Sequence, residues 1–247
     1  MLTVFQESFH PSLDTAVSHA LLRHAAEIST TETLRIYRPT EVVAFGKRDA
    51  VAAGFQLAVR SARVAGYESV VRLAGGRAAV FHQETIAFGW TIPCSDPRTG
   101  ISERFKRLSG LLVKTFRDLG ADARIGEVPG EYCPGEFSIN LDGTSKVMGV
   151  GQRLIAGAVH VGGVIVVDGG SLIADVLVPV YRDLGVDWNP LTSGDLRSAV
   201  PGLTWDATRD AVLESFAQIA DIEYKPLPTE ILERAKTLEP QHSVSDV

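Results

Sequence analysis

Apolar residues recur at helical spacing at several places along the chain. Leu13, Val17 and Leu21 fall on one face of a helix predicted over residues 11–28. The clearest apolar stripe predicts a helix over residues 102–119, and Gly120 follows it as a stop signal. Further helices are predicted over residues 51–65, 172–184, 195–200, 207–219 and 229–238.

Segments rich in valine, isoleucine and aromatic residues predict the strands. These strands cover residues 33–37, 41–45, 69–73, 78–93 (one long strand or a pair), 136–141, 146–155 and 159–167. Asp142-Gly143 is a strong turn signal, so the strands on either side of it are expected to form a hairpin. Strands occur in clusters with helices placed irregularly between them, which favours an α+β or mixed α/β fold over a regular βαβ succession.

The strand pattern ends near Asn189-Pro190, and only helices are predicted after it. We therefore expect a main domain over residues 1–190 and a helical extension, packed on it, over residues 191–247. The length of 247 residues suits such an arrangement and allows a sizeable core.

Composition narrows the class of function. The net charge is −6 and the pI about 5.5, which argues against a nucleic-acid partner. The chain starts without a basic segment and a long apolar run, and it has no apolar stretch of the roughly 20 residues that a membrane helix needs. We expect a soluble cytoplasmic protein. The two cysteines give no disulfide framework, and the histidines show no metal-ligand spacing.

A glycine pair interrupts two predicted strands and has arginines on both sides. Gly75-Gly76 lies between Arg72 and Arg77, and glycines allow a backbone to approach a ligand closely. Taken alone, an ordinary turn with surface arginines is the better interpretation. The segment is neither a Walker A loop nor a dinucleotide fingerprint, since no Gly-Lys-Ser/Thr and no helix follows it.

Cys133 and Lys146 are the candidates for nucleophilic chemistry. Cys133 stands in a Cys-Pro-Gly turn before a strand, and Lys146 opens the return strand of the predicted hairpin. A nearby lysine lowers a thiol pKa, and the thiolate is the reactive form. The residues alone leave open whether the two side chains meet, and each has an ordinary structural alternative.

Together these segments resemble the catalytic domain of the biotin/lipoyl protein ligase and octanoyltransferase superfamily. The similarity lies in 71–76 (Val-Arg-Leu-Ala-Gly-Gly) with Phe81-His82, in 132–135 (Tyr-Cys-Pro-Gly), and in 146–153 (Lys-Val-Met-Gly-Val-Gly-Gln-Arg). The Cys-Pro-Gly turn ahead of the lysine strand is typical of the octanoyl-[glycine cleavage H protein]:protein N-octanoyltransferases. The resemblance implies a class II aminoacyl-tRNA synthetase/biotin synthetase-like α+β fold, a mixed sheet flanked by helices.

The resemblance also implies an activity. Cys133 would carry an octanoyl or lipoyl group as a thioester, Lys146 would lower its pKa, and no cofactor or metal would be needed. The donor would be an octanoylated or lipoylated protein (glycine cleavage H protein or acyl carrier protein), and the acceptor a lipoyl-domain lysine. The implied substrate-binding residues are Arg72, Gly75, Gly76, Arg77, His82, Gly149, Gln152 and Arg153. Val80, Ile86 and Met148 are expected to surround the acyl chain.

Three positions depart from the family pattern. Val71 replaces an arginine of the loop, Arg77 replaces a small residue, and Glu84 stands where glycine is common. These changes weaken an ATP-dependent lipoate or octanoate ligase, which needs that loop to hold an acyl-adenylate. That ligase remains one alternative, and a non-catalytic acyl-binding relative is the other.

Overall fold

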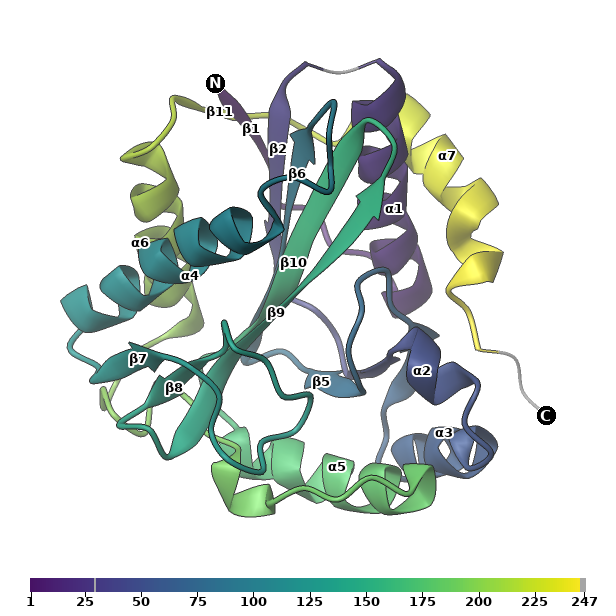
Figure 1. Cartoon of the computed structure of the whole chain (residues 1–247), viewed down its shortest axis with the longest axis vertical. Helices are drawn as coiled ribbons and strands as arrows, with labels where there is room; N and C mark the ends of the chain where they lie inside the picture. Colours follow the sequence, from purple (N-terminus) through teal and green to yellow (C-terminus); the bar gives the residue numbers. More distant parts are fainter. Residues whose placement is uncertain (29, 245–247) are drawn as a thin grey trace.

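An eight-stranded mixed β-sheet forms the centre of the molecule (Figure 1). The structure is a computed structural model and describes residues 1–28 and 30–244. The strand order is β11-β1-β2-β6-β10-β9-β8-β7, and a separate three-stranded sheet has the order β4-β3-β5. The strands are β1 (Leu2–Phe5), β2 (Glu32–Tyr37), β3 (Val42–Phe45), β4 (Glu68–Val71), β5 (Ala79–Phe81), β6 (Thr85–Pro93), β7 (Ala123–Ile125), β8 (Ile139–Leu141), β9 (Ser145–Ile155), β10 (Ala158–Val166) and β11 (Ile222–Tyr224).

Helices cover both faces of the large sheet. They are α1 (Pro11–Glu27), α2 (Lys47–Ala50), α3 (Phe55–Val64), α4 (Ile101–Asp118), α5 (Gly170–Leu184), α6 (Trp205–Ala217) and α7 (Thr229–Leu238). Helices α1 and α7 pack together on one side, α4 and α6 on the other, and α3 and α5 lie against the small sheet (Figure 1). The α+β prediction is confirmed. Within the described residues no helix is long and apolar enough to cross a membrane.

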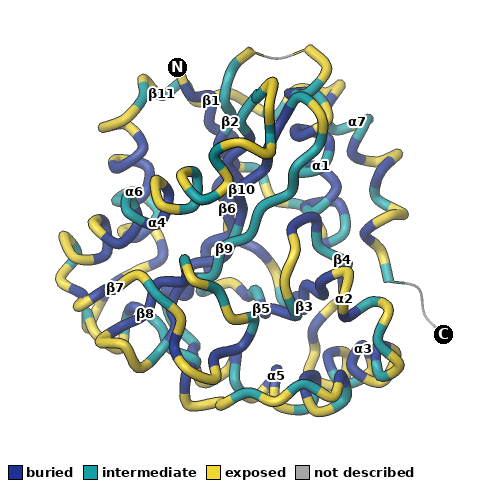
Figure 2. The backbone as a smooth tube through the Cα atoms, in the orientation of Figure 1, coloured by how far each residue is buried: buried dark blue, intermediate teal, exposed yellow. Residues whose placement is uncertain are grey.

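The hairpin of β9 and β10 forms the boundary between the core and the site. Strand β10 pairs with β6 along its whole length and with β9 on its other side. Figure 2 shows β6 and β10 as buried and much of β9 as only half-buried. Strand β9 borders an open cavity at residues 149–152, whereas β6 lies between layers of packed side chains.

Most predicted elements exist, with three differences, and of the two alternatives for residues 78–93 the pair of strands is confirmed. The segment 78–93 is a pair of strands, β5 and β6, separated by a turn in which the Thr85 N–H donates to the His82 carbonyl at 2.8 Å. The strand predicted over 136–141 is confined to β8, since residues 136 and 137 form a turn. Residues 196–200 are turns and bends instead of a helix. The helix predicted over 51–65 begins at Phe55, after the short α2.

The C-terminal segment is joined closely to the rest of the chain. It contributes β11, which sequence patterning did not predict and which pairs in parallel with β1. Phe216 of α6 lies edge-on to Trp90 of β6, with ring centroids 5.7 Å apart, in one shared core. The division at residue 190 stays a prediction.

Beyond α7, His242 holds the edge strand of the small sheet. The Val71 N–H donates to the His242 carbonyl at 2.9 Å, and His242 Nδ1 donates to the Val71 carbonyl at 2.8 Å. With its proton on Nδ1, the ring accepts at Nε2 from His19 Nδ1 of α1 at 3.0 Å. Burial lowers the pKa of His242, which suits this neutral form.

A buried ion pair fastens α1 to β2, and we expect its loss to be costly. Arg35 is 1% exposed, forms an ion pair with Asp14 and donates to the Asp14 carbonyl at 2.8 Å. We expect Asp14→Ala to lower the free energy of unfolding by about 3–5 kcal/mol, because the guanidinium is left buried without its counter-charge. Urea denaturation measures this difference. Asp118→Ala, which breaks an exposed pair with Lys114, is the control and should cost less than about 1 kcal/mol. Equal losses in the two variants would contradict the prediction.

Candidate active site

Cys133 lies in the loop between β7 and β8 and has an unusual backbone conformation. Its φ is +43°, in the left-handed region that few non-glycine residues adopt. The Cys133 N–H donates to the Tyr181 hydroxyl at 2.9 Å, and that hydroxyl donates to the Ala78 carbonyl at 2.9 Å. The Cys133 carbonyl accepts from Lys146 Nζ at 2.8 Å. Contacts on both backbone groups therefore hold the cysteine in a conformation that costs energy.

Two donors approach the sulfur from the glycine loop. Arg72 Nη2 and the Arg77 N–H each lie 3.2 Å from Cys133 Sγ. Burial raises the pKa of the thiol, but the charges of Arg72 and Lys146 and these two hydrogen bonds outweigh it. The net result is a Cys133 pKa below the ordinary value. The site therefore favours a thiolate, which is the nucleophilic form.

Lys146 contacts the cysteine through its backbone and not through the sulfur. The ammonium is buried and donates to Glu131 Oε1 at 2.9 Å, to the Tyr132 carbonyl at 3.0 Å and to the Cys133 carbonyl at 2.8 Å. These contacts use all three of its donors. The predicted hairpin of β8 and β9 brings Lys146 here, as expected from the Asp142-Gly143 turn. Sequence reasoning missed Glu131, because a glutamate in a loop gives no sign that it is buried.

Gly76 is required where the glycine loop meets the sulfur. Its φ is +106°, and a Cβ at this position would lie 2.7 Å from Cys133 Sγ and 2.2 Å from Arg72 Nη2. Any side chain would therefore displace both the thiol and its partner. The loop lies between β4 and β5, so the edge strand that His242 holds leads directly into Arg72.

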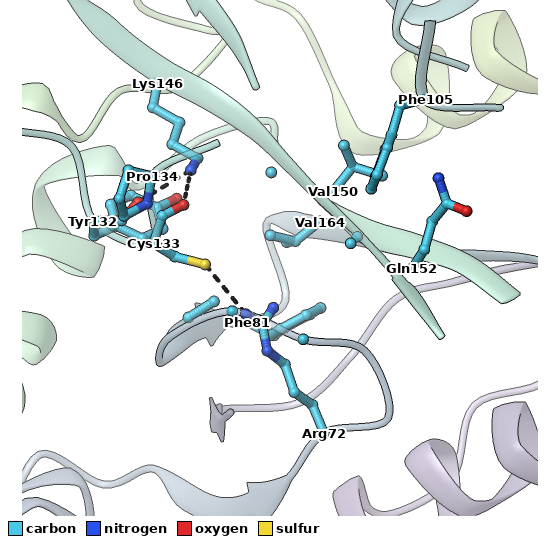
Figure 3. Close-up of a pocket in the computed structure, with 16 residues that line it drawn as sticks. Arg72, Phe81, Phe105, Tyr132, Cys133, Pro134, Lys146, Val150, Gln152 and Val164 are labelled. Carbon is cyan, nitrogen blue, oxygen red and sulfur yellow. Dashed lines mark hydrogen bonds between the residues drawn. The ribbon is translucent and has the colours of Figure 1, made fainter. Parts of the chain in front are cut away.

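A cavity of about 250 Å³ opens at the thiol (Figure 3). Apolar side chains from four elements line it: Ala79, Phe81, Phe105, Val150 and Val164. Gly149 and Gly151 of β9 add walls without side chains, and Gln152 lies near Phe105 in the same lining. The arrangement suits an extended apolar chain with its reactive end at Cys133.

The structure brings together most of the predicted site residues. Arg72, Gly75, Gly76, Gly149 and Gln152 line the cavity with Cys133 and Lys146. Only the backbone of Arg77 reaches the sulfur, because its guanidinium pairs with the buried Asp49 at 3.0 Å. Arg153 is not among the lining residues.

The expectation that His82 lines this cavity is wrong. The turn after β5 directs its ring to the start of α5, where a Cβ on Gly169 would lie 2.8 Å from the ring. The expected acyl walls are also corrected. Val80, Ile86 and Met148 are fully buried in the core, and at β5 it is Ala79 and Phe81 that line the cavity. Side chains alternate between the faces of a strand, so Val80 points away from its two neighbours.

We also searched the described residues for side chains that could bind a metal ion together. Across residues 1–28 and 30–244, no three His, Cys, Asp or Glu side chains group so as to hold a metal ion. The reactive groups around Cys133 are its thiol, two guanidinium groups, one of them paired with Asp49, and the paired ammonium of Lys146.

Curated relatives carry transferase names. The chain is 26% identical over 184 residues to the octanoyl-[GcvH]:protein N-octanoyltransferase of Geobacillus kaustophilus, covering 73% of this chain and 65% of that protein. It is 31% identical over 128 residues to the protein of the same name from Exiguobacterium sp., covering 52% and 45%. A lipoyl-[GcvH]:protein N-lipoyltransferase of Listeria monocytogenes is 23% identical, covering 71% and 63%. The chain thus spans about half to two thirds of the length of these relatives.

Solved structures share the fold. A lipoate-protein ligase A bound with ATP superposes with a TM-score of 0.78 at 18% identity, covering 97% of this chain and 94% of that one. The bi-partite lipoate protein ligase of Thermoplasma acidophilum gives 0.72 at 18% identity, covering 97% and 91%. The fold is therefore the class II synthetase-like α+β fold that the sequence motifs implied. The family model of the lipoyl protein ligase A/B catalytic domain matches residues 10–217, and the chain belongs to this family.

Proposed function

We propose that this protein transfers an octanoyl or lipoyl group, through a thioester on Cys133, to the lysine of a lipoyl domain. The observation that carries the proposal is the thiol itself. It accepts two hydrogen bonds, carries a lowered pKa and opens into an apolar cavity. The names of the curated relatives support the same chemistry.

The reaction proceeds in two steps. The Cys133 thiolate attacks the acyl carbonyl of the donor, the bond from that carbon to the donor's nitrogen or sulfur breaks, and the leaving group takes a proton. A lysine amine then attacks the thioester, the C–S bond breaks, the nitrogen releases a proton to water, and the thiolate returns. Each step starts from an activated or well-oriented carbonyl, so one difficult transfer is divided into two easier ones.

The two donors at the sulfur have a second use in this reaction. Once the sulfur is acylated it no longer carries a negative charge, and Arg72 and the Arg77 N–H are free to donate elsewhere. The oxygen of the tetrahedral intermediate forms next to the same atoms and develops the charge that the sulfur has lost. Fixed donors at that place stabilise the transition state without reorganisation.

The glycine cleavage H protein is the proposed donor, because three curated relatives name it. A lipoyl domain, carried by a different protein, is the proposed acceptor. Octanoyl-acyl carrier protein is the competing donor, and the experiment below includes it.

Intact-mass spectrometry tests the proposal. Wild-type protein is incubated with octanoyl-H protein or octanoyl-acyl carrier protein, without ATP, and then with a lipoyl-domain acceptor. The enzyme should gain one octanoyl mass that hydroxylamine removes, and the acceptor should then gain that mass. Acceptor labelling only with ATP and free octanoate would overturn the proposal in favour of a ligase. Labelling under neither condition would leave a non-catalytic acyl-binding protein.

The cavity also predicts a preference for chain length. Val150→Trp fills the wall opposite Cys133 and should exclude the last methylenes of an octanoyl chain (Figure 3). At about 0.8 kcal/mol per buried CH₂, losing two of them lowers octanoyl transfer relative to butanoyl transfer by about tenfold. Competition between the two acyl thioesters measures this ratio. Leu154→Trp, on the same strand but outside the cavity, is the control; a ratio that is the same in both variants would contradict the prediction.

A further inference from the structure

Cys133 forms part of the wall of two cavities. Besides the acyl cavity of about 250 Å³, a second one of about 410 Å³ reaches the same residue. The two share Gly76, Cys133 and Pro134. Their other walls come from different elements: β5, α4, β9 and β10 for the first, and α2, the loop before Cys133 and the end of α5 for the second. Cys133 therefore stands between two spaces.

The chemistry of the second cavity differs from that of the first. Its walls carry Glu127, Asp187 and Arg48, all exposed to solvent. The other charged groups on its walls already have partners, since Arg77 pairs with Asp49 and Glu131 with Lys146. Within the described part of the chain, neither Glu127 nor Asp187 has an ion-pair partner, so two carboxylates and one guanidinium face the space.

We propose that this second cavity admits the side chain of the acceptor lysine, and we call it the amine cavity. The inference rests on the proposed function and adds the place where the nitrogen nucleophile enters. An acyl chain on Cys133 fills the first cavity, and the second cavity is a separate space that reaches the same residue and is left for the nucleophile. A lysine arrives as an ammonium ion, and two free carboxylates attract that charge.

The second half-reaction needs only the acyl-enzyme, the lysine and water. The lysine first releases a proton to water, and its nitrogen then attacks the thioester carbon. The C–S bond breaks and its electron pair returns to sulfur, while the nitrogen releases a second proton to water as the amide forms. The thiolate then regains Arg72 and the Arg77 N–H as partners. The amide leaves with its acyl chain withdrawn from the first cavity.

The same entrance also serves the first step when the donor is an acylated lysine, because that step is the reverse of the second. When the donor is itself an acylated lysine, its amide enters with the chain in the acyl cavity and its nitrogen in the amine cavity. Donor and acceptor carriers then compete for one entrance, and the free acceptor inhibits acylation of Cys133. This arrangement predicts ping-pong kinetics in which the second substrate is a competitive inhibitor of the first.

Separate measurement of the two half-reactions tests the proposal. Cys133 is acylated with a small octanoyl thioester, and the loss of the octanoyl mass is then followed with Nα-acetyl-lysine amide as the amine. The double variant Glu127→Lys/Asp187→Lys should acylate as wild type does but raise the KM for the lysine probe at least about tenfold. Hydroxylamine, which is uncharged at alkaline pH, should remove the octanoyl group from both proteins at one rate.

Two further variants separate the effect of charge from the effect of space. Glu103→Lys/Asp118→Lys makes the same change in net charge on α4, outside both cavities, and should leave the KM unchanged. Val186→Trp fills the amine cavity without a change in charge and should slow both amines. A double variant with the wild-type KM for the lysine probe would overturn the amine cavity while leaving the acyl-enzyme intact. Failure of the wild type to acylate at all would instead overturn the proposed function, and the amine cavity with it.

Discussion

Cys133→Ala is expected to abolish acyl transfer, by roughly 10³-fold or more, because no other group at the site can hold the acyl chain covalently. Cys94 offers a matched control within the same chain. It is half-buried like Cys133 and packs against the main core, but it does not line the acyl cavity. Cys94→Ser should therefore keep both the covalent intermediate and the turnover.

The measurement combines intact mass with a turnover assay on octanoyl donor and lipoyl-domain acceptor. Cys133→Ala should show no octanoyl adduct that hydroxylamine removes, and its thermal unfolding should stay near that of wild type. Cys133→Ser should also fail to turn over, because a hydroxyl with the same two donors is a weak nucleophile without a base to remove its proton. Transfer at wild-type rate by either variant would contradict a covalent mechanism.

Arg72→Gln is expected to raise the Cys133 pKa, because it removes a cation that contacts the thiol. The sign follows from the charge: the guanidinium stabilises the thiolate, so its removal favours the protonated thiol. At a pH below both pKa values, the variant has a smaller thiolate fraction than wild type, by about 10-fold for each unit of difference between their pKa values. Its rate of alkylation by iodoacetamide falls in the same proportion. The pH dependence of alkylation measures the shift, and at a pH above both pKa values the two proteins should react alike.

Lys146→Met provides a contrast, because Lys146 has a different position. Its ammonium does not donate to the sulfur but to Glu131 and two carbonyls, so its loss leaves a buried carboxylate unpaired. We expect a loss of about 3–5 kcal/mol in the free energy of unfolding, which Arg72→Gln does not share. Lys146→Met/Glu131→Gln should recover part of that stability. An alkylation profile that moves in Lys146→Met but not in Arg72→Gln would contradict the assignment of Arg72 as the main partner of the thiolate.

The parts of the site that sequence predicted are those that local signals determine. Asp142-Gly143 sets the hairpin, and the hairpin places Lys146 beside the strand that follows Cys133. The Gly75-Gly76 pair allows a close approach of the backbone, which the family resemblance placed in the site, and the thiol is what approaches it. In both cases a turn residue constrains its immediate neighbours, so a short stretch of sequence is sufficient.

The parts that sequence missed depend on residues far apart in the chain. Tyr181 supports Cys133 from a helix that forms after β10, and nothing in its own neighbourhood indicates that contact. Strand β11 is short and pairs with β1 alone, at the other end of the chain, whereas β1 also pairs with β2. His82 directly follows Phe81, which lines the cavity, and the hydrogen bonds of the turn after β5 direct its ring away from the cavity.

The hydrogen bonds between Val71 and His242 have a consequence for how the protein is made. Val71 and His242 are separated by 171 positions, so at roughly 5–20 residues per second a ribosome needs about 9–34 seconds to add the second after the first. During that interval the edge of β4 is uncovered, and β1 also waits for β11. A nascent chain therefore exposes two unpaired strand edges while it is synthesised, and unpaired edges are where chains associate with one another. Slow synthesis and chaperone binding should matter more for the yield of this protein than for one whose sheet is completed in chain order.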